Sequence, residues 1–208
     1  MMTKKLLILL LTLGVVFAAR PLTTDDPGTQ PGDTYGFEYN YNNIDTHTFT
    51  FKRGMSDIWE IDLNISHKTD GSKFPCDMSV LNKYRFADKV GGMVDMGLAL
   101  NLGKDKDGDS SAQLIWLNTA SLDNLQFNLN WGYEAGNQSW SSGLAIDAHI
   151  IPGLFDIVAE YRSDEGAKSY LAGSRYFLGN ILWDLSFTFD PDSDPTYKST
   201  AFGLTYNF

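Results

Sequence analysis

The chain has 208 residues, enough for a single domain, and its mean hydropathy of -0.22 excludes a bundle of membrane-spanning helices. Its formal net charge of -10 excludes the basic surface that nucleic-acid binding requires. Aromatic residues make up 13% of the chain and 19 residues are glycine, a composition that favours β-structure. Cys76 is the only cysteine, so no internal disulfide can stabilise the fold.

Residues 1–18 predict a cleaved secretory signal peptide. Lys4 and Lys5 precede the apolar run from Leu6 to Val16, and Val16-Phe17-Ala18 offers small residues at the two positions that signal peptidase reads. The run is too short for an anchor helix, which needs about 20 apolar residues. Cleavage removes both lysines and no acidic residue, so the formal charge of the exported chain falls from -10 to -12.

Residues 19–33 predict an extended periplasmic segment, because three prolines and two glycines within it prevent regular structure. This stretch resembles the start of a family of outer-membrane transporters named for the meta-pathway of phenol degradation. In that family an Arg-Pro, an apolar residue and a Thr-Asp-Asp follow the signal, and a Glu lies in the first strand. The matching residues here are Arg20, Pro21, Leu22, Thr24, Asp25, Asp26 and Glu38. The resemblance implies an outer-membrane barrel with a transport role.

From residue 34 to residue 208 the chain repeats one pattern: alternating apolar and polar residues, followed by turn residues. This pattern predicts an all-β, antiparallel, up-and-down transmembrane β-barrel of about twelve strands. Residues 112–119 are apolar on both faces and do not follow this alternation. The expected strands are 35–41, 48–52, 59–66, 78–86, 94–102, 112–119, 125–134, 140–150, 155–162, 170–176, 181–189 and 197–208.

The strand face opposite the apolar one carries unusually small side chains. In a soluble sandwich this face would be solvated and rich in long polar residues. Small residues suit the confined lumen of a barrel better, so this face favours a barrel over a sandwich. The residues concerned are Gly97, Ala99, Gly132, Gly143, Ala145, Gly173, Ala201 and Gly203.

The connections between the expected strands alternate in length. Compact turns are expected near residues 54–56, 87–89, 121–123, 151–153 and 178–179, and longer charged loops at 68–77, 103–110, 163–168 and 190–195. Short periplasmic turns and longer outer loops are typical of such barrels. Aromatic residues form two expected belts. The periplasmic belt is Trp59, Tyr84, Phe86, Tyr176, Trp183 and Phe208, and the outer belt is Trp131, Tyr133, Trp140, Tyr161 and Tyr170.

The last strand ends the chain on an aromatic residue. Phe202, Leu204, Tyr206 and Phe208 alternate with small or polar residues, which resembles the closing strand of bacterial outer-membrane barrels. The resemblance implies that the barrel-assembly machinery recognises this segment in a Gram-negative cell. It also implies that outer-membrane lipid and lipopolysaccharide surround the protein.

The polar face predicts a charged lumen. Its expected lining residues are Glu38, Lys52, Glu60, Asp62, Lys83, Arg85, Asp95, Glu134, Asp147, Asp156, Glu160, Arg162, Arg175 and Asp184. Opposed charges across a water-filled bore would pass small solutes passively and favour cations or neutral polar molecules. In the alternative, the charges pair and fill the lumen, as in a structural or adhesive barrel.

Catalysis is the less favoured alternative. A lipid-active enzyme of this architecture needs a nucleophile beside its base, and no serine stands out near His47 and His67, which could approach each other at the outer ends of their strands. The loops 105–109 and 190–194 place carboxylates at every second residue, which suits either Ca²⁺ binding or simple solvation. We favour solvation, and the sequence predicts no catalytic residue, metal site or cofactor.

Overall fold

The computed structural model describes residues 27–42, 46–69, 74–105, 107–192 and 197–208. The predicted signal peptide therefore lies outside the described residues, as do the first residues of the predicted periplasmic segment. None of the described segments is a helix long and apolar enough to cross a membrane.

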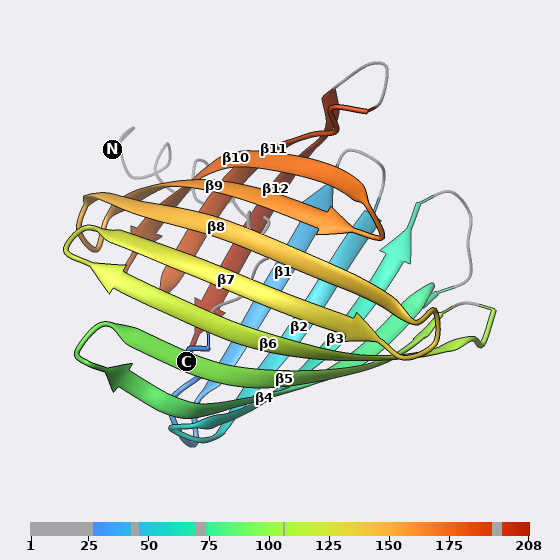
Figure 1. Cartoon of the computed structure of the whole chain (residues 1–208), viewed down its shortest axis with the longest axis horizontal. Coiled ribbons are helices and arrows are strands. Elements are labelled where there is room, and N and C mark those ends of the chain that lie inside the picture. Colours follow the sequence, from blue (N-terminus) through green and yellow to red (C-terminus); the bar gives the residue numbers. More distant parts are fainter. Residues whose placement is uncertain (1–26, 43–45, 70–73, 106, 193–196) are drawn as a thin grey trace, which may run out of the picture.

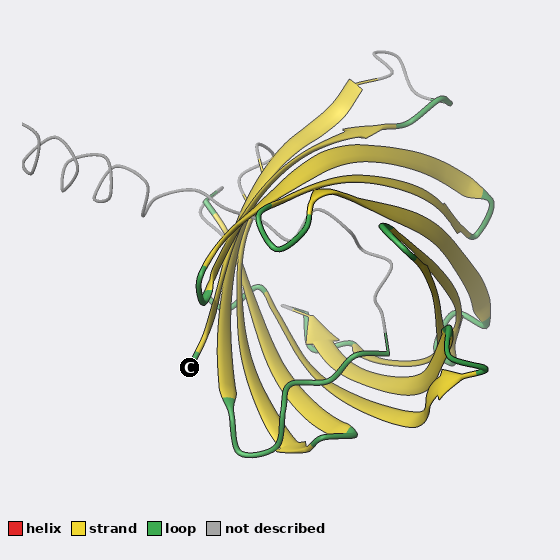
Figure 2. Cartoon of the chain, turned by 90° about the vertical axis from the view of Figure 1, so that its left-hand side faces the viewer, coloured by secondary structure: helices red, strands yellow, loops and turns green. Residues whose placement is uncertain are grey.

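Twelve strands make up the described fold. They are β1 (Tyr35–Asn42), β2 (Thr46–Ser56), β3 (Trp59–Lys68), β4 (Asp77–Val90), β5 (Val94–Asp105), β6 (Ser110–Leu122), β7 (Leu125–Glu134), β8 (Ser139–Ile151), β9 (Phe155–Asp164), β10 (Ala167–Leu178), β11 (Ile181–Phe189) and β12 (Tyr197–Asn207). Each strand pairs antiparallel with its neighbours in sequence, and β1 pairs with β12 to close the barrel (Figure 1). Figure 2 shows the strands forming a ring. The prediction of an antiparallel twelve-stranded barrel is confirmed.

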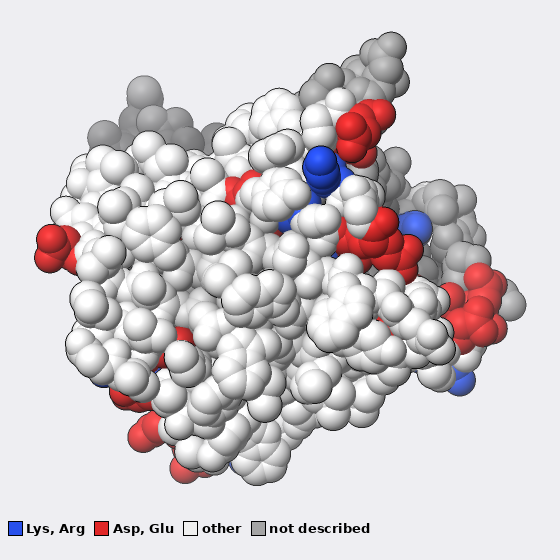
Figure 3. Space-filling model, viewed as in Figure 1, with Lys and Arg blue, Asp and Glu red and all other residues white. Residues whose placement is uncertain are grey.

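Alternation sorts the side chains between two faces because successive residues of a strand point in opposite directions. On β3, Leu63 is exposed on the outer face while its neighbour Asp62 is buried. On β6, whose sequence is apolar on both faces, Leu114 and Trp116 are exposed and Leu117 is fully buried. The visible outer wall is largely uncharged, and most of its acidic and basic residues gather towards the two ends of the barrel (Figure 3).

The barrel closes at a seam between the first and the last residues of the sheet. Tyr35 and Phe208 exchange two backbone hydrogen bonds of 2.9 Å, and their rings stack with centroids 6.0 Å apart. From there the register pairs Phe37 with Tyr206 and Tyr39 with Leu204. Closure satisfies the backbone groups of both edge strands, which would otherwise be free to pair with other chains.

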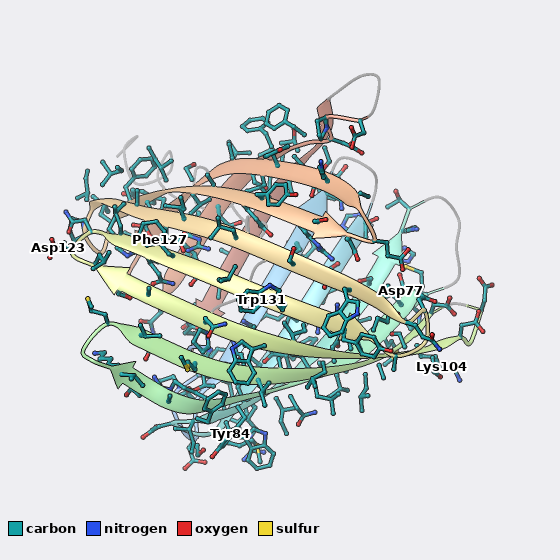
Figure 4. The ribbon with its side chains drawn as sticks, viewed as in Figure 1. Asp77, Tyr84, Lys104, Asp123, Phe127 and Trp131 are labelled. Carbon is teal, nitrogen blue, oxygen red and sulfur yellow. The ribbon has the colours of Figure 1, made fainter. Side chains whose placement is uncertain are left out.

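The two ends of the barrel differ in their connections. At the end that holds Tyr35 and Phe208, which we call the turn end, at most three residues separate consecutive strands. The opposite end, which we call the loop end, holds all four connections longer than three residues, including the one between β3 and β4. The two ends are marked by Asp123 at the turn end and by Asp77 and Lys104 at the loop end (Figure 4).

One predicted loop is wrong. Residues 163–168 were expected to form a longer charged loop, but only Glu165 and Gly166 separate β9 from β10. Both residues have positive φ angles, 50° and 88°. Such backbone angles match the twist of a two-residue hairpin, so the strands continue through the charged residues on either side.

Candidate channel interior

Most of the predicted lumen charges are buried, although each lies on a strand whose other face is exposed. Because the sheet is a single closed layer, buried alternate positions face the inside of the barrel. Lys83 is only 1% exposed and Asp147 also 1%. The other strongly buried members of the predicted set are Glu38, Lys52, Glu60, Asp62, Asp156, Glu160 and Asp184.

The first group of buried charges lies on β1 to β4, and we call it the β1–β4 cluster. Lys52 Nζ lies 2.8 Å from Glu38 Oε1 and 4.0 Å from Asp62 Oδ2. Lys83 Nζ lies 3.2 Å from Glu60 Oε1. Each lysine therefore has a carboxylate partner on an adjacent strand, as buried charges require. The cluster holds three acids and two bases, so its formal charge is negative.

The second group lies on β6 to β10, and we call it the β6–β10 network. Arg175 Nη1 donates to Asp147 Oδ1 over 3.0 Å, although β8 and β10 are not neighbours. Asn128 Nδ2 donates to the other oxygen of Asp147 over 3.1 Å, and Thr119 donates to Asn128. A linked chain of polar side chains thus joins four strands, β6, β7, β8 and β10, and fixes that wall of the interior.

Two further members of the predicted set lie at the turn end. Arg85 donates to the backbone oxygen of Asp57 over 2.7 Å and lies 3.7 Å from Asp88. Asp95 accepts a 2.8 Å hydrogen bond from the backbone of Lys89. These two side chains hold turns together rather than facing the middle of the barrel.

The loop end of the interior is hollow and exposed. One cavity of about 480 Å³ and another of about 470 Å³ share Glu134 and Asn137 in their linings. Asp77, Lys104, Asp105 and Asp109 add charge to the first cavity. Arg162, Asp164, Glu165, Lys168 and Asp190 add charge to the second. Both cavities are large enough for a small solute.

A smaller cavity, of about 250 Å³, lies towards the turn end. Gly28, Thr29 and Gln30 line one part of it, so the described part of the predicted periplasmic segment reaches into the barrel. The charged side chains that also line it are Glu38, Lys52, Glu60, Lys83 and Arg175. The β1–β4 cluster and the β6–β10 network therefore meet around this cavity.

Part of the interior is apolar, which the sequence does not predict. Leu117 and Val158 are fully buried, and Val158 packs with Ala145 and Leu171. Val158 lies midway between Asp156 and Glu160, so strict alternation could have placed it inside. The inward position of Leu117 could not be predicted, because β6 carries apolar residues on both faces.

The histidine pair and the first acidic loop make contacts within the fold. His47 pairs with His67 in register, with ring centroids 6.5 Å apart, and its Nδ1 lies 2.7 Å from the Tyr39 hydroxyl. In the first acidic loop, Asp105 accepts backbone hydrogen bonds from Asp107 and Asp109, both 2.9 Å long. Within the described part of the chain, no group of three or more histidine, cysteine or acidic residues is arranged to hold a metal ion.

Comparison with known proteins relates the fold to that of porins. No protein-family model matches the sequence, and a search of curated proteins found no match. Among solved structures, the KdgM porin superposes with a TM-score of 0.70 and 9% identity, over 84% of this chain and 99% of the porin. The NanC porin superposes with a TM-score of 0.59 and 10% identity, over 84% and 98% of the two chains. The chain therefore has a porin-like barrel fold.

Proposed function

We propose that this protein is a passive channel of the bacterial outer membrane that conducts small cationic or neutral polar solutes. The observation that carries the proposal is a closed barrel with an apolar outer wall, a polar interior and cavities at both ends. An outer wall of this kind suits hydrocarbon, and a polar interior suits water and solutes. The fold shared with the KdgM and NanC porins supports the same assignment.

The charge of the interior supports a cationic or neutral cargo. Without Arg85 and Asp95, which hold turns together, the predicted lumen set holds eight acids and four bases, counting Lys52. Another structure of the KdgM porin is in complex with disordered oligogalacturonate, a chain of acidic sugars. A net negative interior repels such anions, so we propose a different cargo here.

A second candidate is a structural barrel with a closed lumen. Lys83, Leu117 and Asp147 are at most 1% exposed, so water barely reaches this part of the interior. Paired charges that fill a barrel of intermediate girth would produce this burial. The loop-end cavities would then be dead-end pockets.

Conductance separates the two candidates. Purified, heat-modifiable protein in a planar bilayer should give single-channel current steps. In a salt gradient, the reversal potential should have the sign that indicates a preference for cations over anions. Liposome swelling with lysine, a neutral disaccharide and galacturonate then ranks cargo by charge. Swelling should be slowest with galacturonate. Bilayers without steps would leave the structural barrel as the remaining assignment.

We further propose an orientation and a route of assembly. The short connections support a turn end, with residues 27 and 208, that faces the periplasm and a loop end that faces outward. Phe202, Leu204, Tyr206 and Phe208 are proposed as the signal for the barrel-assembly machinery, since Phe208 lies at the closing seam. Lipid and lipopolysaccharide are the proposed surroundings of the outer wall, and residues 1–18 the proposed export signal.

Kinship with the meta-pathway transporter family stays a prediction. Six of the seven matching residues, Arg20 to Asp26, lie outside the described residues. The seventh, Glu38, forms the ion pair with Lys52. Its role in this structure is to keep a lysine paired inside the barrel.

A further inference from the structure

We infer that residues 27–32, which we call the mouth segment, are a built-in constriction that sets the size limit of the channel at its turn end. The inference rests on the proposed channel function and adds the element that determines its specificity for size. No strand of the barrel includes this segment, yet it lies against the inner face of β2, β3 and β5.

Glycines in the barrel wall make room for the mouth segment. A Cβ atom at Gly54 of β2 would overlap the backbone oxygen of Pro31 and would lie 2.6 Å from that of Gln30. A Cβ at Gly36 of β1 would overlap the side chain of Gln30. At Gly97 of β5, a Cβ would lie 3.0 Å from the Pro27 ring. The wall is thus shaped to the segment at three separate strands.

Hydrogen bonds fix the mouth segment in this position. The backbone N–H of Gln30 donates to the buried carboxylate of Glu60, and the Gln30 side chain donates to Asn207 over 2.6 Å. The Gly32 N–H donates to the side chain of Asp57 over 3.0 Å, and the Thr29 hydroxyl donates to the backbone oxygen of Asp57 over 2.8 Å. These bonds connect the segment to β3, β12 and the turn after β2, so it runs across the inner face of several strands rather than along one.

The mouth segment narrows the route that a solute would take. Gly28, Thr29 and Gln30 form part of the lining of the 250 Å³ cavity, which is about half the volume of either loop-end cavity. A solute that leaves a loop-end cavity for the turn end then meets this smaller cavity, which the segment lines together with charged side chains such as Lys83 and Arg175. Size selection therefore falls at the turn end, where the segment occupies part of the cross-section.

The test displaces the segment in one variant and enlarges it in another. In Gly54→Ala the new methyl group meets the backbone of Pro31 and Gln30, which must move away. In Thr29→Trp the segment's own side chain grows into the cavity. The matched control is Gly132→Ala, because a Cβ there meets only the side-chain ends of Ser141 and Gln113. Single-channel conductance and swelling with a series of neutral oligosaccharides are measured on the full chain, after heat-modifiability has shown that each barrel is folded.

The expected result is a larger conductance and exclusion limit for Gly54→Ala, a smaller conductance for Thr29→Trp, and wild-type values for Gly132→Ala. Conductance in Gly54→Ala but not in the wild type would also support the inference, with the segment closing the channel fully. Wild-type values in both test variants would place the constriction elsewhere while leaving the channel intact. Equal gains in Gly54→Ala and Gly132→Ala would also overturn the inference. If neither the wild type nor any of the three variants conducts, both the proposed channel function and the proposed constriction are wrong.

Discussion

The turn-end and loop-end halves of the interior use charge in opposite ways. In the turn-end half, Lys83 is 1% exposed and paired with Glu60, and Asp147 is held by both Arg175 and Asn128. In the loop-end half, charges such as Arg162 and Asp164 form an exposed pair of 3.1 Å beside open cavities. One half is thus organised like a protein core and the other like a surface.

The two halves separate the charges that determine the shape of the barrel from the charges that meet the solute. A buried ion that loses its partner is costly because the surrounding protein solvates it poorly. An exposed pair contributes little to stability, because water and salt screen it. We therefore expect charge changes at the turn end to act on folding, and charge changes at the loop end to act on selectivity.

Lys83→Met should give the largest effect. The change leaves Glu60 buried without its lysine partner, and removing one member of a buried pair typically costs about 3 to 5 kcal/mol. The free energy of unfolding from a urea titration in detergent or lipid measures the loss. Lys104→Met, at the exposed loop end of β5, is the control and should change it by less than about 0.5 kcal/mol. Equal losses from the two changes would mean that the two halves do not differ in this way.

Leu63→Arg should have the next largest effect. Leu63 is exposed on the outer wall of β3, and an arginine in the hydrocarbon region of such a barrel costs about 2 to 4 kcal/mol. Asn64→Arg, one residue away, points into the loop-end cavity and should cost much less. The same folding titration compares them. Equal destabilisation by the two arginines would contradict the division into a lipid face and a lumen face.

The fold could be predicted from the sequence because alternation records the environment of each face of a strand. On β7, every second residue from Leu125 to Tyr133 is apolar. A shift of one residue against β8 would turn these apolar side chains towards the polar face, so the pattern also determines the register of the pair. The strand ends were less predictable. β4 extends to Val90, beyond its expected end at Phe86. Backbone pairing with β5 continues there, although these residues do not alternate between apolar and polar.

The partners inside the lumen could not be predicted in the same way. Alternation places Arg175 and Asp147 on the inner face, but only the three-dimensional course of the strands brings two non-adjacent strands together. The sequence also gave no sign that Gln30 would reach Asn207, 177 residues away. Contacts of this kind depend on how the barrel closes, which a local pattern does not record.

Phe208→Ala should have a moderate effect on the turn end. Its ring stacks on Tyr35 at 6.0 Å and on Tyr206 at 5.5 Å, and an aromatic pair is worth about 0.5 to 1.5 kcal/mol beyond its buried area. The measurement is the free energy of unfolding, with Phe208→Leu as the variant that keeps apolar area without the ring. Full stability in both variants would show that the backbone hydrogen bonds of the seam are sufficient.

Glu134→Gln should have the smallest effect on stability and a clear effect on selectivity. Glu134 lines both loop-end cavities, so its carboxylate acts on solutes entering either one. Replacing it with an uncharged side chain of the same shape should leave the free energy of unfolding unchanged and move the reversal potential in a salt gradient towards zero. Low salt should enlarge the difference from the wild type, because screening by mobile ions weakens the field of an exposed charge. A reversal potential that stays at its wild-type value would show that the filter for charge, like the proposed filter for size, lies at the turn end. The loop-end half would then serve only as an open vestibule.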